Sequence, residues 1–143
     1  MGTGGTIAGT AASSSDHTGY TAAQLSVQDL LKCVPGMQEA LRGDALESEQ
    51  VAQLDSKDMD FATMTRIAQR CAHHLAQADV RGIVITHGTD TLEETAYFLH
   101  LVLGNACAEL ITQKPVVLTC AMRPATSSEA QAGECCQVTQ HGF

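Results

Sequence analysis

Two short clusters of hydroxyl, carboxylate and imidazole side chains, each built around glycines, contain the residue types that chemistry needs. They are residues 3–9 (TGGTIAG) and residues 87–91 (HGTDT). A threonine hydroxyl is a weak nucleophile at its own pKa, so a base or a hydrogen-bonded neighbour must activate it. In the second cluster Asp90 could hold a substrate ammonium, and the N–H groups at a helix start could bind a carboxylate. Together these groups suit a small zwitterionic ligand.

Each cluster also has a purely structural interpretation. The first is not a dinucleotide-binding turn, because Ile7 stands where that motif requires its third glycine, and no Gly-Lys-Ser/Thr follows for a phosphate-binding loop. A flexible turn that presents Thr6 and a simple loop remain equally open. In the second cluster, a helix N-terminus explains Thr91 well but explains Thr89 and His87 less well. His87 could be a general base, or it could form a hydrogen bond within its own turn.

The elements that must position these clusters follow from apolar patterns. Short apolar runs predict buried strands over residues 50–54, 80–86 and 114–119, and helical periodicity predicts helices over residues 26–34, 60–78 and 92–103. The second cluster therefore lies at the carboxyl end of a strand, where open α/β sheets bind their ligands. No strand is expected before the first cluster, and residues 9–20 are expected to form a mobile loop. Alternating strands and helices predict an α/β fold with a parallel sheet.

Composition favours one globular domain and excludes several classes of function. The 143 residues are 44% hydrophobic and 17% charged, with a net charge of −8. Only 8 lysines and arginines are present, so we expect no nucleic-acid partner. No segment is long and apolar enough for a membrane span and no signal peptide is recognised, so the 6 cysteines are expected to be reduced thiols of a cytoplasmic protein. Their spacing does not suit a zinc site, and no metal is expected.

Four segments occur in the order found in one enzyme family: residues 3–9, 55–59 (DSKDM), 87–91 and 121–124 (AMRP). Through them the sequence, from about residue 3 to residue 127, resembles the bacterial-type L-asparaginases, which are homotetrameric asparaginase/glutaminase amidohydrolases. The helix after Asp90 is most similar to that of the type II branch. The resemblance implies an α/β fold with a partial three-layer, mostly parallel sheet of the Rossmann-like or flavodoxin-like kind. It also implies L-asparagine, or L-glutamine, as a small-molecule substrate, and neither a metal nor an organic cofactor.

The resemblance assigns catalytic roles to four residues. Thr6 matches the nucleophile that attacks the side-chain amide, forms an acyl-enzyme and releases ammonia. Tyr20 matches a tyrosine on a flexible lid that activates this threonine. Thr89 matches a second catalytic threonine that handles water and proton transfer, and Asp90 matches the residue that grips the α-ammonium of the substrate.

Two further residues are implied to bind substrate. Ser56 matches a binder of the substrate α-carboxylate. Lys57 occupies a substrate-contact position where many relatives carry glutamine. Thr89 and Asp90 complete the implied substrate-binding set.

The sequence also departs from the family. The first strand is expected to be missing, and no segment matches the lysine that partners Thr89 or the smaller C-terminal domain. We therefore assign residues 1–127 to an incomplete N-terminal domain and residues 128–143 to a divergent, irregular tail. The abrupt loss of pattern near Ser128 suggests a frameshift or a truncated gene model. Resequencing of the locus that reveals no downstream reading frame for the missing half would contradict this hypothesis.

By descent, the expected function is hydrolysis of L-asparagine to L-aspartate and ammonia. The alternative is a catalytically inactive remnant that at most binds a small amino acid or associates with intact subunits. A third option is the asparaginase-like amidotransferase subunit that acts on charged tRNA, which the shortage of basic residues disfavours.

Overall fold

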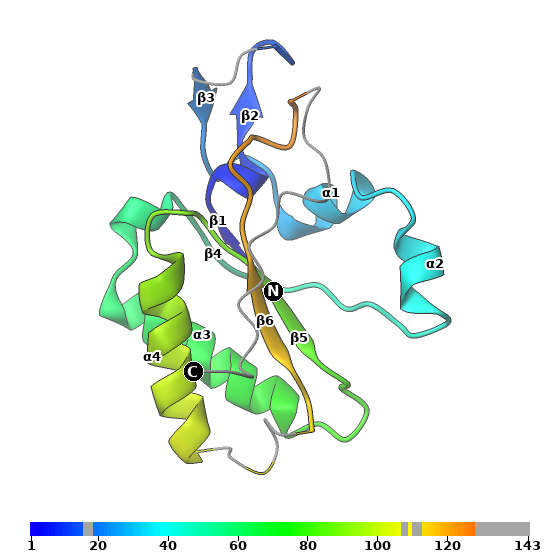
Figure 1. Ribbon diagram of the computed structural model, residues 1–143, viewed down its shortest axis with the longest axis vertical. Helices are drawn as coiled ribbons and strands as arrows, with labels where there is room; N and C mark the ends of the chain where they lie inside the picture. Colours follow the sequence, from blue (N-terminus) through cyan, green and yellow to red (C-terminus); the bar gives the residue numbers. More distant parts are fainter. Residues whose placement is uncertain (16–18, 107–108, 110–112, 128–143) are drawn as a thin grey trace.

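A four-stranded parallel sheet forms the centre of the computed structural model, which describes residues 1–15, 19–106, 109 and 113–127. Its strand order is β4-β1-β5-β6. The strands are β1 (Gly2–Gly4), β4 (Gln50–Leu54), β5 (Ile83–Thr86) and β6 (Val116–Thr119). The sheet and its flanking helices confirm the predicted α/β class, and Figure 1 shows their arrangement.

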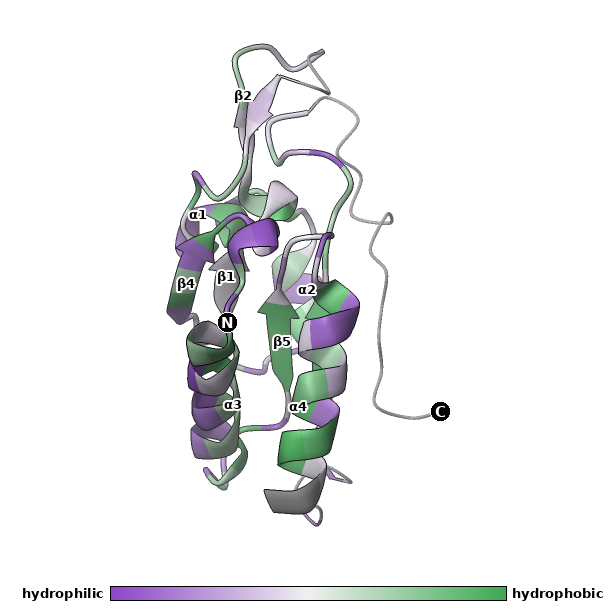
Figure 2. Ribbon diagram, turned by 90° about the vertical axis from the view of Figure 1, so that its left-hand side faces the viewer, coloured by the Kyte–Doolittle hydropathy of each residue, from purple (hydrophilic) through white to green (hydrophobic). Residues whose placement is uncertain are grey.

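Helices lie on both faces of this sheet. On one face lie α3 (Phe61–Leu75) and α4 (Leu92–Ala106), as Figure 2 shows. They enclose the main apolar core, in which Ile67, Leu99 and Ile85 are almost completely buried. On the other face α1 (Val27–Lys32) packs against β1, and α2 (Met37–Leu41) follows it. This second layer is short.

The predicted helices and strands are confirmed where caps or periodicity mark them. The helix expected from residue 26 begins at Ser26, whose hydroxyl accepts a hydrogen bond from the Asp29 N–H at 3.2 Å. Asp60 caps α3 in the same way, through the Thr63 N–H at 2.8 Å. The strand predicted over residues 50–54 matches β4, while β5, β6 and α3 are shorter than predicted.

The expectation that no strand precedes the first glycine cluster is wrong. β1 lies between β4 and β5, with the Gly2 N–H donating to the Glu49 carbonyl at 2.8 Å and the Thr86 N–H donating to the Met1 carbonyl at 2.9 Å. Glycines pair through their backbone and have no side chains to make a period-two pattern, so the sequence gives no signal for this strand. β1 is three residues long and overlaps the start of the glycine cluster.

The loop expected over residues 9–20 also contains structure. Thr10–Ala11 (β2) and Tyr20–Thr21 (β3) pair as antiparallel strands, in the register Thr10 to Thr21 and Ala11 to Tyr20. Each strand is only two residues long, which is too short for a periodic pattern. The tail predicted over residues 128–143 lies outside the described residues, so the domain boundary at residue 127 stays a prediction. No helix among the described residues is long and apolar enough to cross a membrane.

Glu49 joins the sheet to α3 through an ion pair with Arg70 and a hydrogen bond with His74. Its carboxylate lies 2.6 Å from Arg70 Nε and 2.6 Å from His74 Nε2. Partial burial opposes ionisation of Glu49, but the hydrogen bonds to His74 and Arg70 outweigh this effect, so the pKa of Glu49 lies below its ordinary value of 4.5. A carboxyl group with a lowered pKa in the folded state stabilises the protein above its unfolded-state pKa, and this contribution is lost as the pH falls through the folded-state pKa.

We expect Glu49→Gln to lower the free energy of unfolding at neutral pH by about 1 kcal/mol. The difference between the wild type and the variant should shrink as the pH falls below 4.5, because wild-type Glu49 then becomes protonated as well. Urea unfolding at a series of pH values measures this. Glu47→Gln is the matched control, since Glu47 has no ion pair within the described part of the chain. A difference that stays constant down to pH 3 would contradict the role given to Glu49.

Candidate active site

The carboxyl ends of three parallel strands meet at one point, through the backbones of two glycines and the side chain of Ser56. Gly5 follows β1, Ser56 lies two residues beyond the end of β4, and Gly88 lies two residues beyond β5. A Cβ placed on Gly5 would lie 2.3 Å from the Gly88 Cα, and one placed on Gly88 would lie 2.3 Å from Ser56 Oγ. Gly5 also has a φ of 77°, in the region that favours glycine. The three strand ends therefore touch where no side chain larger than hydrogen fits on either glycine.

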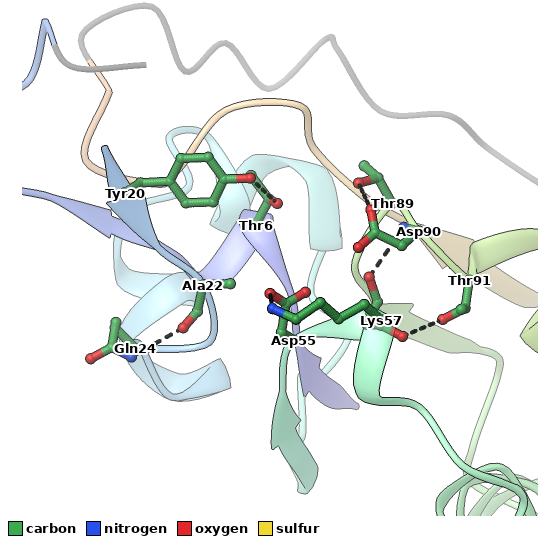
Figure 3. Close-up of polar contacts among 10 residues, drawn as sticks. Thr6, Tyr20, Ala22, Gln24, Asp55, Lys57, Thr89, Asp90 and Thr91 are labelled. Atoms are coloured by element: carbon green, nitrogen blue, oxygen red, sulfur yellow. Dashed lines mark hydrogen bonds and ion pairs between the residues drawn. The ribbon is translucent and has the colours of Figure 1, made fainter. Parts of the chain in front are cut away.

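Thr6 lies on one side of this contact, at the start of a 3₁₀ turn over Thr6–Ala8. The residue is 8% exposed, and its Oγ1 is 2.9 Å from the hydroxyl oxygen of Tyr20 (Figure 3). Tyr20 comes from β3, so the small β2–β3 sheet brings it to Thr6. The Ala11 N–H of that sheet donates to Thr126 Oγ1 at 2.9 Å, which ties it to the segment after β6.

Ser56 connects the other side of the contact to the turn after β5. Its residue is 2% exposed, and its Oγ accepts a hydrogen bond from the Asp90 N–H at 3.1 Å. Its carbonyl oxygen accepts another from Thr91 Oγ1 at 2.8 Å. Because Oγ is used only as an acceptor among the described residues, the Ser56 hydroxyl proton remains able to donate to a ligand.

Thr89 and Asp90 lie together above Ser56. The Thr89 hydroxyl donates to Asp90 Oδ1 at 3.3 Å, and the Asp90 residue is exposed. Asp90 therefore combines a fixed backbone, held by Ser56, with a carboxylate that faces solvent. A carboxylate in that setting can bind a cationic group such as an ammonium.

Lys57 lies beside this group and is paired with Asp55. Its Nζ is 2.7 Å from Asp55 Oδ2, across the single turn of 3₁₀ helix over Ser56–Asp58. The hydrogen bond to Asp55 raises the pKa of Lys57, and the charges of Asp55, Asp58 and Asp90 raise it further. The same hydrogen bond lowers the pKa of Asp55. The sequence prediction named Lys57 but not Asp55, because nothing in the spacing shows that the two side chains fold back on each other.

Of the two roles left open for His87, a general base or a hydrogen bond within its own turn, the structure shows the hydrogen bond. Its ring is completely buried, and Nδ1 lies 2.8 Å from the Gly88 carbonyl oxygen, within its own turn. Burial lowers the pKa of His87, which keeps the ring neutral. A buried, neutral ring that forms a hydrogen bond within its own turn supports the Gly88 turn.

Figure 3 shows how the predicted site residues lie together. The Thr6–Tyr20 pair and the Thr89–Asp90 pair come from different strand ends, and Lys57 extends from the turn between them toward Asp55. Among the described residues, no group of three or more histidine, cysteine, aspartate and glutamate side chains could hold a metal ion. The arrangement offers a hydrogen-bonded hydroxyl, a hydroxyl donor and an exposed carboxylate.

Residues 1–135 match a family model described as Asparaginase, N-terminal. The chain belongs to the asparaginase family. It is 42% identical to L-asparaginase 2 of Bacillus subtilis over 91% of this chain and 32% of that protein. It is 40% identical to the glutaminase-asparaginase of Pseudomonas fluorescens over 91% of this chain and 33% of that protein.

The fold agrees with a solved asparaginase structure. The protein named probable cytoplasmic L-asparaginase from Campylobacter jejuni superposes with a TM-score of 0.75 at 40% identity, over 88% of this chain and 35% of that one. The chain thus spans about a third of the length of the asparaginases it matches. The family match also extends eight residues past the boundary predicted at residue 127.

We expect Gly88→Ala to lower the free energy of unfolding by about 2 kcal/mol, because the new methyl group would overlap Ser56 Oγ. Gly104→Ala is the matched control in this asparaginase-family chain. Gly104 lies in α4 with nothing within 4 Å of an added Cβ, so this change should stabilise the chain by about 1 kcal/mol through helix propensity. Chemical unfolding of both variants measures the difference. Equal effects of the two substitutions would show that the glycine contact is not tight.

Proposed function

We propose that this chain carries the amide-hydrolysing half-site of an L-asparaginase, with Thr6 as the nucleophile. The observation that supports this most is the 2.9 Å hydrogen bond between Thr6 Oγ1 and the Tyr20 hydroxyl, made at a nearly buried threonine. A hydrogen-bonded partner is what an otherwise weak threonine nucleophile requires. The Tyr20 hydroxyl would act as a proton relay: its oxygen accepts the Thr6 proton as Oγ1 attacks the carbonyl carbon of the side-chain amide, while its own proton passes to the amide nitrogen that leaves as ammonia.

The remaining residues would orient the substrate. The exposed carboxylate of Asp90 suits the α-ammonium of an amino acid, and the hydroxyl of Ser56 suits its α-carboxylate. Attack by Thr6 would give an acyl-enzyme and release ammonia, and water would then release L-aspartate. Thr89, whose hydroxyl is directed to Asp90, would assist the water and proton transfer. Lys57 would contact the substrate from the rim.

L-Asparagine is the substrate we propose, with L-glutamine as the alternative. The name of the Bacillus subtilis relative contains only asparaginase, while that of the Pseudomonas fluorescens relative contains both activities. The name of the Campylobacter jejuni relative supports a cytoplasmic location, which for this chain stays a prediction, as does a homotetramer.

A second candidate is a remnant that binds an amino acid without turning it over. It is favoured by the position of Lys114, whose Nζ donates to the Leu75 carbonyl oxygen at 2.9 Å. Lys114 lies just before β6, at the end of the sheet opposite to Thr89. In the described part of the chain, no hydrogen bond joins Thr89 to a lysine. Losing one member of a cooperating catalytic set costs orders of magnitude in rate.

Replacing Thr6 by alanine should reduce ammonia release from L-asparagine by about a thousandfold or more, because the nucleophile is removed. The measurement is a coupled ammonia assay on the purified chain. Thr65→Ala is the control, since Thr65 lies exposed on α3 and its hydroxyl bonds only the Phe61 carbonyl among the described groups. Folded wild-type protein that releases no ammonia would overturn the proposal and leave the second candidate.

We expect Tyr20→Phe to lower kcat about a hundredfold while KM changes little, because the lost hydroxyl contacts Thr6 rather than the substrate. Tyr97→Phe is the matched control, since Tyr97 lies exposed on α4. Steady-state kinetics with L-asparagine separate the two parameters. An unchanged kcat in Tyr20→Phe would mean that another group accepts the Thr6 proton.

A further inference from the structure

An ion pair flanks Ser56 at the rim of the site. Lys57 Nζ lies 2.7 Å from Asp55 Oδ2, and the two residues stand on either side of Ser56 in the sequence. Ser56 between them is held, because the Asp90 N–H donates a hydrogen bond to its hydroxyl oxygen and the Thr91 hydroxyl donates one to its carbonyl oxygen. The ion pair therefore lies at the surface, on both sides of a residue that is held in place.

This pair is easily opened. The Lys57 side chain is 64% exposed and that of Asp55 is 34% exposed. Exposed ion pairs contribute little net stability, because water solvates both charges and holding two side chains in one geometry costs entropy. A carboxylate of a bound ligand could therefore replace the Asp55 carboxylate on Lys57 at little cost.

The charges around Lys57 determine how strongly Asp55 affects the binding of a ligand carboxylate. Asp55, Asp58 and Asp90 all act on the Lys57 ammonium, and Asp55 has the largest effect because it is in direct contact. While Lys57 is paired with Asp55, its charge is largely compensated, and an approaching carboxylate meets a rim of net negative charge. The Asp55 carboxylate therefore opposes the binding of any ligand that carries its own carboxylate near Ser56.

We propose that Asp55 is an internal counter-ion that competes with the ligand's α-carboxylate for Lys57 and so limits the affinity of the site for amino acids. We name this pair the Asp55–Lys57 latch. The inference rests on the proposed function, because it takes the ligand to be L-asparagine or its product L-aspartate. Asp55 is a positioning residue in this scheme: it acts on the ligand only through Lys57.

Calorimetric titration of the full chain with L-aspartate tests the latch, because binding of the product needs no turnover. Asp55→Asn should bind L-aspartate about three- to fivefold more tightly than the wild type, as expected for release of one exposed ion pair. Asp58→Asn is the matched control. It removes a carboxylate from the same turn, but one that forms no ion pair with Lys57 among the described residues, and it should change the affinity less than twofold.

The gain must depend on Lys57. Lys57→Met should weaken L-aspartate binding, and Asp55→Asn added to Lys57→Met should give no further change. Asp55→Ser is the second variant that removes the carboxylate, and it should reproduce the gain if Asp55→Asn fails to fold. A gain that persists without Lys57, equal gains in Asp55→Asn and Asp58→Asn, or no L-aspartate binding in any variant would each overturn the latch.

The Thr6→Ala background separates this inference from the proposed function. The affinity gain of Asp55→Asn should persist there, because Thr6 does not contact the pair. Wild-type protein that shows the gain but releases no ammonia would overturn hydrolysis alone. Ammonia release that depends on Thr6, with no gain from Asp55→Asn, would overturn the latch alone.

Discussion

The close approach of Gly5, Gly88 and Ser56 is the constraint on which the site depends. Each of the three is adjacent in sequence to a residue with a proposed chemical role: Gly5 precedes Thr6, Gly88 precedes Thr89, and Ser56 precedes Lys57. The approach involves two glycine backbones, which have no rotamers to adjust. The relative positions of the site residues are therefore set by the register of the parallel strands, and little is left to side-chain packing.

The sheet can fix these positions because its inner strand β1 has little side-chain volume and the main apolar core lies on one face of the sheet. β1 pairs with β4 and β5 through its two glycines, Gly2 and Gly4, while the apolar residues of β5 and β6 pack against α3 and α4. A strand with little side-chain volume lets α1 approach it closely: a Cβ on Gly2 would lie 2.6 Å from Val27 Cβ. Stability comes mainly from apolar side chains buried between the sheet and α3 and α4, whereas β1 mainly sets the position of Thr6.

What the sequence could predict followed from side-chain patterns. The β4 strand, the Ser26 and Asp60 caps and the helical stripe of α3 all involve side chains whose spacing is visible in the sequence, and the structure confirms them. β1 was not predictable in this way, because a glycine-rich strand is defined by its neighbours. The Asp55–Lys57 pair was missed because the spacing of these residues does not show the 3₁₀ turn over Ser56–Asp58, where the two side chains meet.

The charges of the site bear on how one small ligand could be held at both ends. A zwitterion needs a negative group for its ammonium and a donor or positive group for its carboxylate, and the exposed carboxylate of Asp90 meets the first need. For the second, the structure offers a neutral hydroxyl on Ser56 and a charged ammonium on Lys57 that is already paired. A neutral donor gives direction with little attraction at a distance, whereas a free ammonium would attract carboxylates of any kind, including the product. Pairing Lys57 with Asp55 reduces that general attraction, so under the proposed function discrimination would fall to the fixed Ser56 hydroxyl and to the Thr6–Tyr20 pair.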